Sequence, residues 1–333
     1  MIKTKVLSAV FIASAAFGLA RTAAAADAPA CEVDDTIKFG GMNWESNLIL
    51  ADVERHILEK GYGCKTEVVP TETLTALAAL ERGDLQVNTE IWLNSVSDAW
   101  AKAEKSGKVK RVGELYTGRE AWYIPKYTAS KFPDLKSAAD LIRHKDAFAD
   151  PESPDKGRIY GCPAGWNCQL VATNLAKVSS WTRTSRFMLP VPAQPEGSLM
   201  SAYKRKKDIV FYYWEPTPLV STLELVKLDM PAYDKEKQQC LTREDCANPQ
   251  AVGYPDNPVF TALNTQFIQD APTLTAFFSK VSVPFDVVNK TLAYMEESGG
   301  ETSEVAQWFL KNQQDIWSKW VPAEVADRVK ATL

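Results

Sequence analysis

The sequence predicts an α/β protein with two lobes, each built on a mostly parallel sheet flanked by helices. Three observations favour this class. Short apolar strands alternate with amphipathic helices in two successive cycles, the pattern of parallel sheets covered by helices. A mature chain of about 300 residues exceeds what one hydrophobic core usually supports. Tryptophans follow several strands, at the sheet edge where ligands bind in open sheets of this kind.

The start of the chain predicts a cleaved secretory leader. Lys3 and Lys5 precede an apolar run, and a small-residue stretch ends at Ala26. The run is too short to span a bilayer, and no later segment approaches eighteen consecutive apolar residues. We therefore expect a signal peptide over 1–26 and a soluble protein exported to the periplasm.

The charge balance and the missing motifs exclude several function classes. The leader removes three of the 38 basic residues and leaves 35 against 42 acidic ones, a net charge of about −7 that argues against a nucleic-acid partner. No CxxC occurs, and the two histidines, His56 and His144, lie away from the cysteines, so we expect no metal and no cofactor. The chain contains neither GxSxG nor HExxH, which argues against an enzyme.

Six cysteines in an exported protein predict disulfides. Six allow fifteen connectivities, and neighbouring pairs are the simplest choice because two of them are only six residues apart. This pairing joins Cys31 to Cys64, Cys162 to Cys168 and Cys240 to Cys246. In the chain-entropy model the long loop contributes about 3.8 kcal/mol and each short loop about 2.4 kcal/mol. The short pairs are therefore expected mainly to fix local shape.

The first cycle of elements opens with a strand after Thr36 that ends in glycines. An amphipathic helix follows over 46–60 and is expected to stop at Gly61, because glycine is common just after a helix end. Apolar alternation and turn residues then predict a strand over 64–71, a Leu- and Ala-rich helix over 72–82 and a strand over 83–92.

The second cycle follows the same logic. Apolar runs predict strands over 120–125, 157–162, 208–218 and 259–264, and helical periodicity predicts helices over 134–145, 169–177 and 197–206. The remaining tail is helical. Because the chain is expected to cross back near its end, we assign 27–121 and 258–333 to lobe 1 and 122–257 to lobe 2.

Four tryptophans share a position at the end of a strand, before a turn or helix: Trp44, Trp92, Trp166 and Trp214. A single tryptophan is usually a packing residue, but two from each half at equivalent positions indicate a shared site. Trp166 lies in the ring GCPAGWNC at 161–168, whose backbone N–H groups can converge on an anion while the indole faces a cation. The other six tryptophans are expected to pack structurally.

These segments resemble the glycine betaine and proline betaine binding proteins of ABC importers. The similarity extends over most of the mature chain, and its most specific parts are GCPAGWNC at 161–168, VFYYWEPTP at 210–218, ERGDLQVNTEIW at 81–92 and NWES at 43–46. The resemblance implies a type II periplasmic binding protein fold with the ligand in the cleft between the lobes. It also implies a monomer that delivers its ligand to a membrane permease with an ATPase.

The resemblance further implies roles for individual residues. Trp92, Trp166 and Trp214 would form a box for a quaternary ammonium head, and the N–H groups of Asn167 and Cys168 would hold a carboxylate tail. Some relatives place a histidine four residues after the tryptophan that corresponds to Trp92. Here that residue is Val96, which weakens the carboxylate anchor.

The identity of the ligand therefore stays open. Glycine betaine is the first expectation, and choline or trimethylamine N-oxide with a glutamate as polar anchor is the alternative. Glu45, Glu90, Glu120 and Glu215 flank the motifs, and each alone is more often a surface acid. If one points into the cleft it would repel a carboxylate, and Glu120 and Glu45 are the first to test. A ligand-sensing protein without a transport role is a further alternative.

Overall fold

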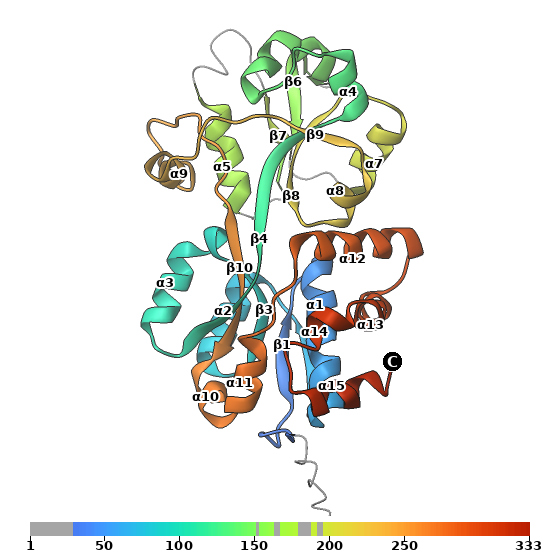
Figure 1. The fold of residues 1–333 in the computed structure, drawn as a ribbon. Helices are drawn as coiled ribbons and strands as arrows, with labels where there is room; N and C mark the ends of the chain where they lie inside the picture. The colour runs from blue at the N-terminus through green and yellow to red at the C-terminus, as the bar shows by residue number, and fades with distance from the viewer. Residues whose placement is uncertain (1–28, 151–152, 163–166, 179–187, 192–195) are drawn as a thin grey trace, which may run out of the picture.

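The computed structural model describes residues 29–150, 153–162, 167–178, 188–191 and 196–333. Two α/β lobes lie one above the other (Figure 1). Lobe 1, at the bottom, holds β1 to β3, and lobe 2, at the top, holds β6 to β8. Strand β4 (Val109–Pro125) runs from lobe 1 into lobe 2. The predicted α/β class is confirmed.

Within the described residues, the strands form one path in the order β2, β1, β3, β10, β4, β8, β6 and β5, with β7 beside β6 and β9 beside β4. Strands β1 to β3 are parallel, and so are β6 to β8, whereas β10 and β4 run antiparallel to their neighbours. Besides β4, the strands are β1 (Ile37–Gly41), β2 (Thr66–Pro70), β3 (Val87–Trp92), β5 (Ala149–Asp150), β6 (Ser153–Tyr160), β7 (Met188–Val191), β8 (Val210–Glu215), β9 (Leu225–Lys227) and β10 (Asn257–Asn264).

Helices cover both faces of each sheet. In lobe 1 one apolar cluster lies under α1 and the C-terminal helices, and a second lies under α2 and α3 on the opposite face. Among the described residues the α-helices are α1 (Glu45–His56), α2 (Thr73–Arg82), α3 (Ser97–Lys105), α4 (Lys126–Lys131), α5 (Asn167–Ala176), α7 (Glu196–Lys204), α8 (Pro218–Thr222), α9 (Lys235–Leu241), α10 (Thr265–Asp270), α11 (Pro272–Phe278), α12 (Phe285–Ser298), α13 (Thr302–Asn312), α14 (Gln314–Trp317) and α15 (Ala323–Lys330).

The end of the first helix differs from its prediction. After α1 the chain continues as a π-helix over Ile57–Tyr62 and ends at Gly63, which has φ of 78°. The expected stop at Gly61 is therefore wrong. Gly61 is buried against α15, and a Cβ there would lie 2.7 Å from Cγ1 of Val325. Because Gly61 has no side chain, α15 can pack closely against it. The residue with left-handed backbone that ends the helix is Gly63, two residues later.

Two elements of the second cycle also differ. The strand expected over 120–125 is the end of the 17-residue β4. The first part of β4 carries charged, solvent-exposed residues such as Lys110 and Glu114, so its sequence lacks the apolar run that predicts a strand. The helix expected over 134–145 is a 3-10 helix over Ala138–Phe148 with a kink at His144.

Strand β4 pairs with β10 up to Gly118 and with β8 from Arg119. The proposed lobe limits stay a prediction.

The two lobes also meet through helices. Helix α8 of lobe 2 packs against α12 of lobe 1. The Ser221 hydroxyl on α8 lies 3.1 Å from the Asn289 side-chain oxygen on α12. This contact joins the halves on the side of the molecule opposite α3 and α9 in Figure 1, whereas β4 and β10 join them nearer its centre.

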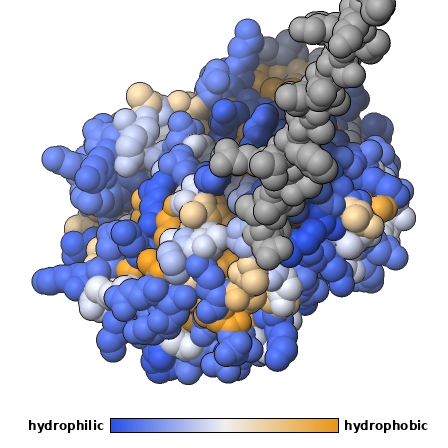
Figure 2. Space-filling view, turned by 60° about the horizontal axis from the view of Figure 1, so that its bottom comes forward, coloured by the Kyte–Doolittle hydropathy of each residue, from blue (hydrophilic) through white to orange (hydrophobic). Residues whose placement is uncertain are grey.

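The face of the molecule seen in Figure 2 is largely hydrophilic outside the grey atoms. Figure 2, which turns the lower end of Figure 1 toward the viewer, shows charged and polar residues broken by small apolar patches. No helix among the described residues has both the length and the apolar character needed to cross a membrane.

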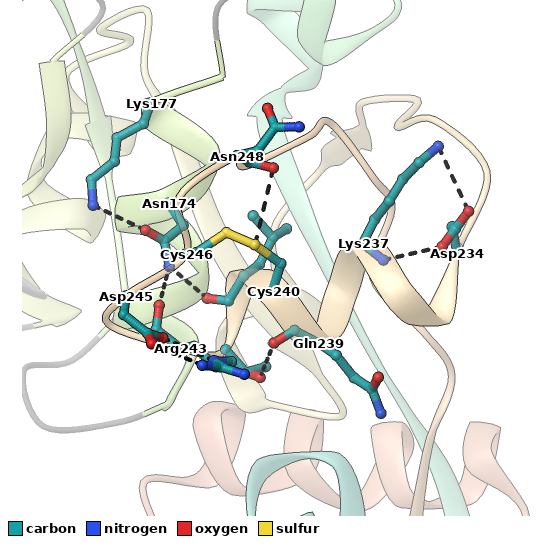
Figure 3. The surroundings of a disulfide bond; sticks show 12 residues. Asn174, Lys177, Asp234, Lys237, Gln239, Cys240, Arg243, Asp245, Cys246 and Asn248 are labelled. Atoms are coloured by element: carbon teal, nitrogen blue, oxygen red, sulfur yellow. Dashed lines mark hydrogen bonds and ion pairs between the residues drawn. A yellow bond between two sulfur atoms is a disulfide. The ribbon is translucent and has the colours of Figure 1, made fainter.

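Three disulfides are present, and they follow the pairing that the spacing favours: Cys31 with Cys64, Cys162 with Cys168 and Cys240 with Cys246. Figure 3 shows the last of these. The fully buried Asn174 on α5 donates its side-chain amide to the carbonyl oxygens of Leu241 and Arg243, at 2.9 and 2.8 Å. The loop closed by this disulfide thus holds α5, whose first residues are Asn167 and Cys168.

Replacement of Asn174 by Ala should lower the free energy of unfolding by about 2 kcal/mol, because two carbonyl groups lose their donor in a buried setting. Chemical denaturation measures the change. The matched control is Asn312→Ala, since Asn312 is exposed and donates to one carbonyl only, and it should change stability by less than about 0.5 kcal/mol. Equal effects of both substitutions would contradict the role of Asn174.

Candidate functional site

A buried carboxylate in lobe 1 holds two tryptophans. Glu90 lies in β3 and is 0% exposed. Its Oε2 accepts the indole N–H of Trp44 at 2.6 Å and that of Trp92 at 3.4 Å. Ser46 donates to the same oxygen at 3.1 Å, and the Tyr116 hydroxyl donates to Oε1 at 2.6 Å. We call these five residues the indole–carboxylate cluster.

Local structure explains why the cluster forms. Residues two apart in a strand share a face, so Glu90 and Trp92 point to the same side of β3 while Ile91 packs into the core on the other side. Trp44 immediately precedes α1, and Ser46 lies in its first turn. The turn from β1 into α1 therefore places an indole and a hydroxyl over β3.

Burial controls the ionisation of this cluster. Burial raises the pKa of Glu90, while the donors from Tyr116, Trp44, Trp92 and Ser46 oppose the rise. On the neighbouring helix α1, the fully buried Glu54 accepts a hydrogen bond from Thr89 at 2.7 Å. Burial raises the pKa of Glu54 to about 8; Thr89 opposes the rise and the nearby charge of Glu90 adds to it. Glu54 is thus mainly protonated at neutral pH.

One face of β4 connects the cluster to lobe 2. Tyr116, Gly118, Glu120 and Trp122 are two residues apart, so they share this face. The ring of Trp92 lies against Gly118, where a Cβ would come within 2.2 Å of Cζ3. The Trp92 ring therefore packs against β4 only because Gly118 has no side chain.

Trp214 lies next along the same face. It stands opposite Glu120 in the antiparallel β4–β8 pair, and opposite residues share a face. Trp214 is half-buried, stacks on Tyr213 with ring centroids 4.5 Å apart, and packs against the cores of both lobes. The structure thus brings Trp44, Trp92 and Trp214 to one region, where β4 passes between the lobes.

Glu120 lies on the same face of β4, opposite Trp214. The Tyr212 hydroxyl donates to its Oε1, and the ring of Tyr254 lies 5.5 Å from that of Tyr212. Burial raises the pKa of Glu120, and the side chains of Tyr212 and Asn257 counter part of the rise. A carboxyl group half-buried among aromatic rings can accept a hydroxyl hydrogen bond or face a cation.

The other predicted glutamates have different surroundings. Glu45 is half-buried in the first turn of α1, where the helix N-terminus favours a negative charge. Glu215 accepts a hydrogen bond from the Tyr123 hydroxyl at 2.5 Å. Trp166 and the loop 163–166 lie outside the described residues, whereas Asn167 and Cys168 begin α5.

Comparison with known proteins identifies the family of this chain. Residues 35–312 match the family model for the substrate-binding domain of ABC-type glycine betaine transport systems, OpuAC. The chain belongs to this family. It is a family of transport binding proteins and not of enzymes.

Solved structures support the same fold. A choline-binding protein of an ABC transporter, in complex with choline, superposes with a TM-score of 0.66 at 19% identity and covers 91% of this chain and 98% of its own. A glycine betaine/L-proline-binding protein from Borrelia burgdorferi superposes with a TM-score of 0.67 at 19% sequence identity, and the match covers 89% of this chain and 100% of the Borrelia chain. Lactococcal OpuAC, in its closed conformation with glycine betaine, superposes with a TM-score of 0.66 at 18% sequence identity. The match covers 87% of this chain and 100% of the OpuAC chain. The fold is the two-lobed type II periplasmic binding protein fold.

Within this family, the valine at position 96 has a structural role here. Val96 is 7% exposed and packs in the apolar cluster with Ile91 and Trp100 under α2 and α3. This cluster lies on the face of β3 opposite Glu90 and Trp92. Val96 therefore supplies no polar group to the candidate site.

Several residues of the site did not emerge from the sequence. Ser46, Tyr116, Tyr212, Tyr254 and Asn257 reach it through strand pairing or through the turn before α1, which no local pattern reveals. Glu90 is different, because its position two residues before Trp92 in a predicted strand already places the carboxylate beside the indole.

A Gly118→Ala substitution should displace the Trp92 ring and lower the free energy of unfolding by about 1–3 kcal/mol, the usual cost of overpacking. Thermal and chemical denaturation measure this loss. Gly197→Ala is the matched control, because nothing lies within 4 Å of a Cβ at that position, and it should leave stability nearly unchanged. An unchanged stability of Gly118→Ala would show that the ring does not pack against Gly118.

Proposed function

We propose that the protein captures a small trimethylammonium osmolyte of the glycine betaine and choline class in an aromatic box and delivers it to an ABC permease. Trp44, Trp92 and Trp214 supply three walls of the box, and Trp166 is proposed as the fourth. The observation that carries this proposal is the convergence of tryptophans from both lobes on the face of β4 that passes between them. A cation held there would contact both lobes at once.

The chemistry of the walls supports a cationic methylated head. Indole faces attract cations, with about 2 kcal/mol for each desolvated contact. Three walls contribute about 6 kcal/mol, whereas micromolar affinity requires about 8 kcal/mol. Burial of the methyl groups and the negative charges near the box supply further attraction. The structural relatives that bind choline and glycine betaine support the same ligand class.

A glutamate is proposed as the polar group that meets the rest of the ligand. Glu120 stands beside Trp214 and accepts a hydrogen bond from Tyr212. An ionised Glu120 can accept the hydroxyl hydrogen bond of choline, and a protonated one can donate to an N-oxide oxygen. The backbone N–H groups of Asn167 and Cys168, at the start of α5, are proposed as the site for a carboxylate tail.

Capture and release are proposed to follow closure of the lobes around the ligand. Strands β4 and β10 connect the lobes, so bending within them would open and close the box. We further propose that the leader over 1–26 directs export to the periplasm and that the mature protein acts as a monomer. No observation favours a sensory role over transport.

Replacement of Trp214 by Ala should weaken ligand binding at least about tenfold, since it removes one cation-π wall. Isothermal titration calorimetry with glycine betaine, choline, carnitine and trimethylamine N-oxide provides the measurement. The matched control is Trp308→Ala, because Trp308 is also half-buried and stacks on a tyrosine, Tyr294, with ring centroids 4.4 Å apart. This control should bind normally.

Two results would contradict the proposed function. One is that the unaltered protein binds none of the four solutes and instead binds solutes without a quaternary or N-oxide nitrogen. The other is that both tryptophan substitutions weaken binding equally, which would indicate loss of folding rather than loss of a wall.

A further inference from the structure

Within the part of the chain that the structure describes, the carboxylate of Glu90 has no cationic partner. Among the described residues, no Lys or Arg forms an ion pair with this carboxylate, although it is fully buried. The titratable groups that face it are Glu54 from α1 and the Tyr116 hydroxyl from β4. Neither carries a positive charge. A buried carboxylate without a counter-ion is costly.

The hydrogen bonds around Glu90 favour its ionised form. An indole N–H can only donate, and two indoles donate to the same oxygen, Oε2. Ser46 is also within hydrogen-bond distance of that oxygen. An ionised carboxylate accepts all of these donors and the Tyr116 hydroxyl as well, as charge-assisted hydrogen bonds. The geometry is that of a preorganised anion held at the N–H edges of two indole rings.

We propose that Glu90 is the specificity-determining residue of the site: its carboxylate is a fixed negative charge at the N–H edges of Trp44 and Trp92 that selects ligands with a net positive charge. This inference rests on the proposed function and narrows its ligand class to hydroxyalkyl trimethylammonium cations such as choline. In this proposal the ligand cation lies over the faces of the rings and supplies the positive charge that is missing around Glu90 among the described residues.

Two physical effects act together in this arrangement. The carboxylate attracts the cation directly, and the attraction is strong because a buried site has a low effective dielectric constant. The same carboxylate also polarises the indoles through their N–H groups, since hydrogen-bonded groups polarise one another. A zwitterion gains at its cationic end but loses at its carboxylate, which the negative charges of Glu90 and Glu120 repel.

The test compares choline with 3,3-dimethylbutan-1-ol, which has the same shape and no charge. Calorimetry should show that the wild-type protein prefers choline. In Glu90→Gln this preference should fall at least about tenfold, through weaker binding of choline and nearly unchanged binding of the alcohol. Glutamine keeps an oxygen for the indoles, so the rings stay in place. Glu54→Gln is the matched control, because it replaces the neighbouring buried acid, and it should keep the preference.

A second measurement varies the pH. Burial raises the pKa of Glu90, so protonation on acidification begins above the range of an ordinary glutamate. Choline affinity of the wild-type protein should therefore fall as the pH falls, while affinity for the alcohol stays constant. The fall should persist in Glu54→Gln and shrink in Glu90→Gln, which separates Glu90 from Glu54 and from Glu120, whose pKa burial also raises.

The outcomes separate this inference from the proposed function. If the wild-type protein binds choline, Trp214→Ala loses binding, and Glu90→Gln keeps the full preference for choline, only the role of Glu90 is overturned. Equal loss of choline and alcohol in Glu90→Gln also overturns it, because that result indicates a purely structural carboxylate. If the wild-type protein binds no trimethylammonium solute, both the proposed function and the role of Glu90 fail.

Discussion

The carboxylate of Glu90 is the interaction on which the candidate site depends. It fixes two indole rings that come from different parts of the chain, one before α1 and one at the end of β3. An exposed tryptophan ring would sample several rotamers, and ordering it on ligand binding would cost affinity. Because a buried acceptor holds both N–H groups, the rings are oriented before any ligand arrives. The cost of burying the carboxylate is offset by its four donors.

Strand β4 is the second constraint. It changes partners from β10 to β8 between Gly118 and Arg119, at the passage from one lobe to the other. One face of this strand carries Tyr116, Gly118 and Glu120 in succession. Tyr116 completes the indole–carboxylate cluster, Gly118 admits the ring of Trp92, and Glu120 faces Trp214. The register of one strand therefore aligns groups from both lobes.

Much of this arrangement was predictable from sequence, for definable reasons. Strands followed by turns located Trp44, Trp92 and Trp214 because the carboxyl ends of parallel strands converge. The contact of Glu90 with Trp92 could be predicted because the two residues are two apart in one strand. The sequence nevertheless favours Glu45 and Glu120 as the first glutamates to test. The expected end of the first helix at Gly61 failed because a glycine can serve helix packing as well as termination.

Other features depend on long-range pairing and were not accessible. The sequence of β4 does not show that Glu120 stands opposite Trp214, because the register is set by two lobes that assemble around the strand. The contact of Tyr212 with Glu120 has the same origin. The buried position of Val96 depends on the packing of α2 and α3.

A crystal structure of the protein with choline would show whether the three rings and Glu90 form the binding site. We expect the quaternary nitrogen within about 6 Å of the ring centroids of Trp44, Trp92 and Trp214, with Glu90 still hydrogen-bonded to both indole N–H groups. Choline bound away from these three rings, or rings turned away from Glu90 in the complex, would contradict it.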